Sequence, residues 1–391
     1  MVYRFRRCLI TSKNRPPPRS LSNLMILQQF SYHSPVQAHF GAGVSRRVVE
    51  FLKGYEKVAV VSGRTVLDRT GFRQVLDKTL TGKELHFFCE VESNPSIATV
   101  LRGAEFVRSR GCEVIIAVGG GSSLDAAKAI AVFAANESDF FELIGQESFP
   151  HCPLPVIAVP TTCGTGSEMN HYAIITDPEQ HDKLNLYSGA MFPRFALLDP
   201  EMLRTLPAPL VVATAFDALT HGLEGYVSLR ANPFSDTLAL AAMERIIATL
   251  SSGADLYSGS ALADLLFASS LAGVVILHTG TTLLHSLGYY LTNHKLIHHG
   301  AANAILLPYY LKMLALGKVD RYWPVAKLFK KHNFSVQDHL ERLGGEIRLS
   351  ALLSAEEIVM MIDYALTKRN VKSTPFGVNK EFLAEILSGL I

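Results

Sequence analysis

Cysteine is scarce in this chain of 391 residues. The 5 cysteines all lie in its first half, and none forms the close-spaced pair that holds a structural zinc ion. We therefore expect free thiols in a reducing compartment, which favours a cytoplasmic location. The cysteines are Cys8, Cys89, Cys112, Cys152 and Cys163.

The chain also lacks an excess of charge of either sign, because its formal net charge is only +2. Without a strong positive field, no nucleic-acid partner is expected, and the partner should be a small molecule. The most apolar run, residues 265–277, is too short to span a bilayer and follows Asp264. It predicts a buried core helix and no membrane segment.

Acidic residues are missing from residues 1–49, which carry several arginines. Such a start resembles an organellar transit peptide, but Pro16, Pro17 and Pro18 would break an amphipathic helix there. We favour an N-terminal extension over residues 1–30 without fixed structure, or a working protein that begins near Met25. Organellar targeting is the less favoured alternative.

The length exceeds that of one hydrophobic core, which predicts two domains. Up to Asp199, β-branched runs alternate with helical stretches, a pattern typical of an α/β domain with a parallel sheet. After Pro207 only long helices are indicated. We therefore expect an α/β domain over residues 31–205 and an all-helical domain over residues 206–391. The expected strands are 58–62, 113–118, 155–159 and 195–199, and the main helices 209–228, 234–252, 260–278, 281–291 and 300–316.

A glycine-rich turn, Gly119-Gly120-Gly121-Ser122, directly follows the expected strand 113–118 and opens a helix. Glycines let the backbone approach a diphosphate, and the helix start offers unpaired N–H groups and the positive end of its dipole. The turn lacks the third glycine of a dinucleotide fingerprint and the lysine of a P-loop. It predicts an anion cradle, with a plain tight turn as the alternative.

A second polar loop follows the expected strand 155–159 and combines four hydroxyl side chains with two glycines. These groups suit hydrogen bonds to the phosphates, ribose or carboxamide of a cofactor, although a loop that only caps a helix would look similar. The hydroxyl residues are Thr161, Thr162, Thr165 and Ser167.

Asp217 and His221 lie four residues apart in a helical stretch, which places a carboxylate and an imidazole on one helix face. His285 and His299 follow later in the chain. One carboxylate with three imidazoles suits Fe(II) or Zn(II) and leaves a further position for a substrate oxygen. A single histidine among the 14 is more often an ordinary residue, so the set of four carries the prediction.

Five ordered motifs together resemble the iron-containing (group III) alcohol dehydrogenase family: GGGSSLDAAK, PTTCGTGSE, LLDPEMLRTLP, DALTHGLEGY and HHGAANAILLP. The resemblance implies a dehydroquinate synthase-like architecture, with a dinucleotide-binding α/β domain before an all-α metal-binding domain. It implies an enzyme that transfers a hydride between NAD(P) and a small alcohol or aldehyde, while the metal polarises the substrate oxygen. It also implies a homodimer, formed through a strand such as residues 37–41.

The resemblance further implies the site residues. The metal would be held by Asp217, His221, His285 and His299, the last in preference to the neighbouring His298. The cofactor would contact Gly63, Asn94, Gly120, Gly121, Ser122, Asp125, Thr161, Thr162, Thr165, Ser167 and Lys183.

Two positions bear on specificity and proton transfer. Gly63 stands where NAD-preferring members tend to carry an aspartate that repels a 2′-phosphate, and Arg64 follows it, so we predict NADP(H) over NAD(H). Tyr289 stands where many members carry a histidine discussed as a proton relay. It is therefore a candidate catalytic residue, with His278 and His294 as alternatives.

Three other functions stay open at this point. A dehydroquinate synthase-like lyase would need several basic residues for a phosphorylated acid, and residues 278–299 offer only Lys295. A hydroxyacid–oxoacid transhydrogenase would keep its nicotinamide bound, and a catalytically silent binding module would be expected to lose its metal ligands. Pocket shape sets substrate choice, so the motifs predict no particular alcohol, reaction direction or choice between Fe and Zn.

Overall fold

The computed structural model describes residues 29–341 and 349–389. By its internal contacts the chain divides into two compact units, Met1–Tyr32 and His33–Ile391. The expected extension over residues 1–30 lies almost wholly outside the described residues. The fold that follows is that of the second unit.

Six parallel strands form the main sheet, in the order β1-β8-β5-β4-β2-β3. Its inner strands are buried on both faces, as in sheets covered by helices on each side. In β2, Val58 and Val60 enter one core cluster, whereas Ala59 and Val61 enter the other. The strands are β1 (Gln37–Phe40), β2 (Lys57–Ser62), β3 (Glu84–Phe88), β4 (Val114–Gly119), β5 (Val156–Pro160) and β8 (Phe195–Leu198).

Helices and one hairpin connect these strands. The hairpin pairs β6 (Tyr172–Asp177) with β7 (Asp182–Tyr187) in antiparallel register, outside the main sheet. The α-helices of this half are α2 (Val66–Arg69), α3 (Phe72–Thr79), α4 (Ile97–Ser109), α5 (Gly121–Ala135) and α6 (Phe140–Leu143). The 3-10 helices are η1 (Val44–Phe51), η2 (Ser167–Met169), η3 (Gly189–Met191) and η4 (Pro200–Leu203).

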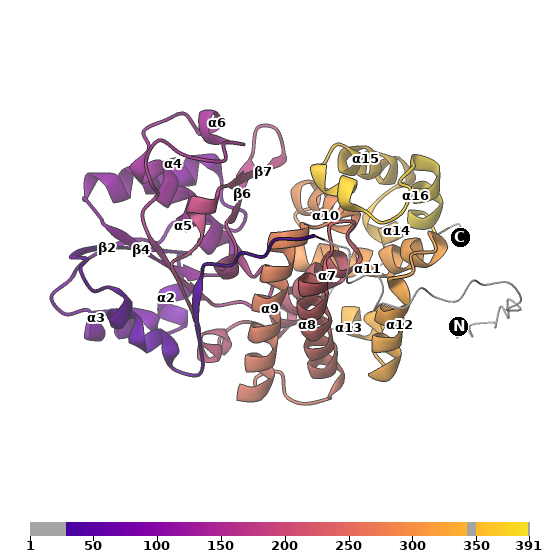
Figure 1. Ribbon diagram of the computed structural model, residues 1–391, viewed down its shortest axis with the longest axis horizontal. Coiled ribbons are helices and arrows are strands. Elements are labelled where there is room, and N and C mark those ends of the chain that lie inside the picture. Colours follow the sequence, from indigo (N-terminus) through magenta and orange to yellow (C-terminus); the bar gives the residue numbers. More distant parts are fainter. Residues whose placement is uncertain (1–28, 342–348, 390–391) are drawn as a thin grey trace, which may run out of the picture. The chain divides into compact units, whose positions relative to one another are not determined.

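The second half of the chain is helical within the described residues. Its first three long helices pack against one another, α11 packs on α7, and α10 packs on α11 (Figure 1). These helices are α7 (Ala208–Val227), α8 (Pro233–Ser251), α9 (Gly259–Thr279), α10 (Leu283–His294) and α11 (His299–Leu316). Shorter helices follow: α12 (Tyr322–Lys331), α13 (Val336–Leu340), α14 (Leu349–Leu352), α15 (Ala355–Leu366), η6 (Arg369–Ser373) and α16 (Lys380–Leu387).

The connection between the two halves runs from the end of β8 at Leu198 to the start of α7 at Ala208. The expected domain boundary near residue 205 falls inside it. Because residues 33–391 form one compact unit by internal contacts, the division into separate domains stays a prediction. The expected class, an α/β half with a parallel sheet before a helical half, is confirmed.

Helix α9 contains the most apolar run of the chain and is longer than that run alone. With 21 residues it is long and apolar enough to cross a membrane, and it is the one such helix in the described part of the chain. However, 72% of its most apolar window is buried inside the protein, against α7 and α8. This burial is typical of a core helix, as the sequence predicts.

Candidate active site

Three helices bring the four expected metal ligands together. Asp217 and His221 lie on α7, His285 lies in the first turn of α10, and His299 is the first residue of α11. The Nε2 atoms of His285 and His299 lie 3.6 and 3.7 Å from Oδ1 of Asp217. Ligand atoms of Asp217, His221 and His285 lie within 4.8 Å of one another. The four side chains therefore form one cluster.

Hydrogen bonds at Nδ1 orient the imidazole rings. Nδ1 of His221 lies 3.3 Å from the carbonyl oxygen of Gly164. Nδ1 of His299 lies 3.4 Å from the hydroxyl of Thr292. Nδ1 of His285 faces a carboxylate of Glu224. When Nδ1 carries the proton, Nε2 keeps its lone pair, so each ring presents Nε2 as a metal ligand.

Burial and neighbouring charges make the cluster attractive to a cation. Burial lowers the pKa of His221, and lowers that of His299 to about 3, so both rings are neutral at pH 7. Burial opposes charge on His285 too, but the carboxylates of Glu224 and Asp217 together outweigh it and raise the pKa of His285 to about 9. Burial favours protonated Asp217, yet the nearby histidines hold its pKa well below the usual range. The two carboxylates leave the cluster net negative.

The donor set fits a divalent ion such as Fe(II) or Zn(II). The amide nitrogen of Asn303 lies 2.9 Å from Oδ1 of Asp217, and 3.1 and 3.3 Å from Nε2 of His285 and His299. Nε2 of His285 or His299 can accept this hydrogen bond only when its ring is neutral, which is also the form that a metal would bind. Oδ1 of Asn303 is buried and has no hydrogen-bond partner among the described residues. Polar atoms therefore converge where a metal would be held.

Within the described part of the chain, solvent reaches the cluster from the side of His299. The side chains of Asp217 and His285 are 3% and 2% exposed, whereas that of His299 is 26% exposed. Tyr289 lies on this open side, with its ring stacked on His299 at 5.5 Å between centroids. Its hydroxyl is hydrogen-bonded to the side chain of Asn370. A substrate oxygen would reach the ligands from the side of His299 and Tyr289.

The alternative residues lie elsewhere. His298 is exposed and precedes α11, so the residue directly before the glycine, His299, is the one that meets the cluster. His294, an alternative proton relay, packs against the rings of Tyr290 and Tyr364. Tyr289 remains the relay candidate that touches the ligand rings.

The two expected cofactor loops pack directly on each other. Gly120 precedes α5, and no side chain caps that helix start. A Cβ atom on Gly120 would lie 3.0 Å from Cγ2 of Thr162, and one on Gly121 would lie 2.5 Å from Cγ2 of Thr165. Glycine is therefore required at Gly121, and the N-terminus of α5 stays open for an anion. Thr161 joins this arrangement by donating its N–H to Gly119.

Asn94 and Lys183 extend this surface. The N–H of Asn94 donates to Oγ of Ser122 at 3.1 Å, and Asn94 has a left-handed φ of 59°. Nζ of Lys183 donates to Oδ1 of Asn94 and to Oγ1 of Thr176, each at 2.8 Å. Gly63 directly follows β2. A Cβ atom built on Gly63 would lie 4.0 Å from Oγ of Ser123. The structure thus gathers these expected cofactor residues at the carboxyl ends of the strands.

Asp125 and Ser167 belong to a buried polar network beneath the two loops. Ser167 donates its hydroxyl to Asp125, which also accepts the N–H of Ile174 at 3.0 Å. Nζ of Lys128 lies 3.2 Å from Asp125 and donates to Oγ of Ser167 at 2.6 Å. Lys128 was not predicted as a site residue. Through these contacts it connects the start of α5 to the loop of residues 161–167, called the hydroxyl loop below.

The loop of residues 161–167 also touches α7, which carries Asp217 and His221, and the neighbouring helix α9. A Cβ atom on Gly164 would lie 2.9 Å from Thr214 on α7, and one on Gly166 would lie 2.4 Å from the backbone of Gly273 on α9. His221 completes the contact through its bond to Gly164. The same loop therefore lies against the cofactor cradle and the metal cluster.

Sequence reasoning missed three further residues around the ligands: Glu224, Thr292 and Asn303. Two of them carry a signal in their spacing. Glu224 follows His221 by three residues and Asn303 follows His299 by four, so each shares a helix face with a ligand. The contact between Thr292 and His299 crosses a turn and has no such signal.

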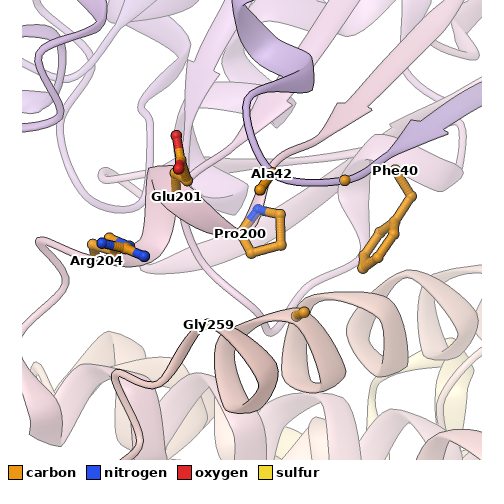
Figure 2. Close-up of a pocket in the computed structure, with 8 residues that line it drawn as sticks. Phe40, Ala42, Pro200, Glu201, Arg204 and Gly259 are labelled. Atoms are coloured by element: carbon orange, nitrogen blue, oxygen red, sulfur yellow. The ribbon is translucent and has the colours of Figure 1, made fainter.

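A separate surface pocket of about 200 Å³ lies beside β1 and the start of α9 (Figure 2). None of the expected site residues lines it. Its lining residues are Phe40, Gly41, Ala42, Pro200, Glu201, Arg204, Gly259 and Ala263. This pocket is not the metal cluster or the cofactor cradle.

Comparison with known proteins agrees with this geometry. Residues 35–200 match the model of the iron-containing alcohol dehydrogenase family, and residues 211–390 match that of the C-terminal domain of Fe-containing alcohol dehydrogenases. A 1,3-propanediol dehydrogenase of Citrobacter freundii is 30% identical, over 93% of this chain and 99% of its own length. An NADPH-dependent butanol dehydrogenase of Clostridium saccharobutylicum is 34% identical, over 75% of this chain and 76% of its own.

A solved structure shows the same fold. The sulfoacetaldehyde reductase from Bifidobacterium kashiwanohense, in complex with NAD+, superposes with a TM-score of 0.84 at 26% identity, over 92% of this chain and 98% of its own. The fold and the site thus define an oxidoreductase of the alcohol dehydrogenase class. The chain belongs to the iron-containing alcohol dehydrogenase family, as its motifs predict.

Proposed function

We propose that this protein transfers a hydride between NADP(H) and a small alcohol or aldehyde in a metal-dependent reaction. The observation that carries the proposal is the convergence of His285 and His299, through Nε2, on the carboxylate of Asp217. Its relatives include enzymes named for propanediol and butanol, which supports a short alcohol or diol as substrate.

Asp217, His221, His285 and His299 would hold the metal. A divalent Fe or Zn ion there would supply Lewis-acid polarisation of the substrate oxygen. The protein contributes neutral imidazoles, because burial lowers the pKa of His221 and His299. It also buries the side chains of Asp217 and His285 almost completely, and the loss of water there strengthens the charge interactions between them.

The cofactor would lie along the two packed loops. The open N-terminus of α5 behind Gly120 would bind the diphosphate, and the hydroxyls of the loop at residues 161–167 would bind the ribose or carboxamide. Nicotinamide would supply or accept the hydride. The bond between Gly164 and His221 would keep the cofactor loop and the metal cluster in fixed register.

The preference for NADP(H) rests on the end of β2. Gly63 offers no carboxylate to bind an adenosine ribose or to repel a 2′-phosphate, and the adjacent Arg64 is exposed. A guanidinium binds phosphate through paired N–H donors. The family uses both cofactors, since one relative is named NADPH-dependent and another was solved with NAD+.

Assembly and location complete the proposal. Strand β1 is the edge of the sheet and is mostly exposed, so its free backbone groups can pair with a second copy to form a homodimer. We propose a cytoplasmic protein without a nucleic-acid or membrane partner. The balanced charge and the burial of α9 support this.

The test combines metal analysis with turnover. Protein purified without added metal should carry about one Fe or Zn per chain and should oxidise NADPH with propanal or butanal. His285→Ala should lose both metal and activity, whereas His151→Ala, which alters an exposed histidine, should keep both. A metal-free protein that stays inactive after Fe(II) or Zn(II) is supplied would support a silent binding module. Activity only with a non-exchanging nicotinamide would support a transhydrogenase.

A further inference from the structure

Glu224 is a fully buried carboxylate beside the metal cluster. It lies on α7, three residues after His221 and seven after Asp217, so all three share one helix face. Its side chain is 0% exposed. A buried carboxylate needs several hydrogen-bond donors to compensate for the water that it loses. The partners of Glu224 therefore indicate what it does.

Those partners all belong to the start of α10. Oε1 accepts the N–H of Thr282 at 2.8 Å, the hydroxyl of Thr282 at 2.5 Å and the N–H of His285 at 3.3 Å. Thr282 is the N-cap residue, but its own side chain caps no helical N–H. Glu224 thus supplies the cap from another helix, with a negative charge at the positive end of α10.

The second carboxylate oxygen, Oε2, contacts Nδ1 of His285. The same side chain therefore binds both the backbone and the ring of this ligand. The rings of His221 and His299 have only neutral partners at Nδ1, a carbonyl and a hydroxyl. A carboxylate partner fixes the tautomer of a metal-binding histidine and increases its basicity.

We propose that Glu224 is a positioning residue, which holds His285 in the tautomer that presents Nε2 to the metal and anchors the helix turn that carries it. The inference rests on the proposed metal site. Glu224 itself binds no metal, because both its oxygens face α10. It joins α7, which supplies Asp217 and His221, to α10, which supplies His285.

Glu224→Gln tests the tautomer. The backbone N–H groups of Thr282 and His285 require an oxygen, so the amide nitrogen of the new side chain would face the imidazole of His285. Nδ1 would then accept a hydrogen bond, and the proton would move to Nε2, where it blocks metal binding.

We expect the affinity for Zn(II), measured by competition with a chromophoric chelator, to fall about 10- to 100-fold in Glu224→Gln. The visible spectrum of the Co(II)-loaded protein should change as a ligand is lost. Thr282→Val removes one donor to Glu224 but leaves the carboxylate on the ring, so it should lower the Tm and keep the wild-type Co(II) spectrum. Asp236→Asn removes a distant carboxylate, paired with Arg321, and should keep the wild-type affinity.

The outcomes separate the two proposals. If the wild-type chain binds no metal, the proposed function fails. If it binds metal and Glu224→Gln binds equally tightly with an unchanged Co(II) spectrum, only the role of Glu224 is overturned. If Glu224→Gln does not fold, Glu224→Asp decides. Its shorter side chain cannot reach the ring and the helix start together, so an unchanged affinity would overturn the inference and a weaker one would support it.

Discussion

Nδ1 of His221 lies 3.3 Å from the carbonyl oxygen of Gly164, and this contact joins the group of expected metal ligands to the loop that we propose binds the cofactor. The two residues are 57 positions apart in sequence. Because binding free energies are reciprocal, a metal that fixes His221 should strengthen cofactor binding, and the cofactor should strengthen metal binding.

Gly164→Ala should disturb both sites at once. Its new methyl group would lie 2.9 Å from Cβ of Thr214 and from the carbonyl of that residue, so the loop must move away from α7. We expect a loss of stability of about 1–3 kcal/mol from overpacking. We also expect Zn(II) affinity to fall about tenfold through His221. Chelator competition and NADPH fluorescence titration would measure both, and unchanged affinities would show that the loop does not couple the sites.

Tyr289→Phe tests whether the phenol relays protons. Burial raises the pKa of this hydroxyl, and the charges of Glu224 and Asp217 raise it further, so it stays protonated at neutral pH. The ring, stacked on His299, would remain in the variant. We expect kcat for butanal reduction to fall less than about tenfold, whereas loss of a proton-transfer group would cost about 100-fold or more.

Tyr289→His addresses the shape of the same open side. The smaller imidazole would vacate space beside His299 and lose the hydrogen bond to Asn370. We expect kcat/KM to rise for longer aldehydes relative to propanal, by up to about tenfold for each additional methylene group that the enlarged space accommodates. An unaltered ranking over a chain-length series would place the substrate away from Tyr289.

Lys183 should make cofactor binding depend on pH. Burial lowers its pKa to about 8, so the ammonium that binds Asn94 is charged at pH 7 and neutral above pH 9. Affinity for the anionic cofactor should fall as the pH rises through about 8. Lys183→Arg stays charged throughout and should remove the inflection from NADPH titrations between pH 6.5 and 9.5. An inflection that persists in the variant would assign it to another group.

Lys183 should also make the free energy of unfolding depend on pH, and this quantity should rise with pH where cofactor affinity falls. The pKa of Lys183 lies below that of a lysine in the unfolded chain, so between about pH 8 and pH 10.4 the folded protein binds fewer protons than the unfolded chain does. The contribution of Lys183 to the free energy of unfolding therefore rises with pH across this window. Comparing urea denaturation of the wild type and Lys183→Met at pH 7 and pH 10 measures it.

Gly63→Asp should convert cofactor choice. A Cβ atom at this position would lie 3.3 Å from Cγ2 of Val66, so the side chain fits after a small shift. Its carboxylate would repel a 2′-phosphate and could bind the ribose hydroxyls. We expect the ratio of kcat/KM for NADPH to that for NADH to fall at least about tenfold. Arg64→Ala should lower the same ratio, and a wild-type preference for NADH would contradict the proposal.

The sequence predicts the buried elements well. The inner strands β2, β4 and β5 are runs of β-branched residues between glycine-rich or polar turns, and the five long helices α7 to α11 begin and end within three residues of their expected limits. Both patterns arise from burial, because buried positions carry apolar residues whose spacing can be read in the sequence. The edge strand β3 and the hairpin β6–β7 were missed, because partly exposed strands alternate too weakly, and the edge strand β1 was expected only from the family resemblance.

Three of the four expected metal ligands could be predicted from the motifs that carry the family resemblance: Asp217 and His221 lie in DALTHGLEGY, and His299 lies in HHGAANAILLP, whereas His285 lies outside the motifs. The side chains that orient the ligands could not be predicted in the same way. Helical spacing places Glu224 on the face of α7 that carries His221, but it does not encode the contact of Glu224 with His285, 61 positions away, or that of Gly164 with His221, 57 positions away. Such partners follow only from how α7 packs against α10 and the hydroxyl loop.

Hydride transfer can be traced directly. NADPH deuterated at C4 of the nicotinamide, prepared as each of the two epimers, would be incubated with butanal and the metal-loaded protein, and the butanol analysed by mass spectrometry. The account predicts deuterium on C1 of butanol from one epimer only, and no product after metal removal or in His285→Ala. Butanol without deuterium from either epimer, or undiminished transfer in the metal-free protein, would contradict the account.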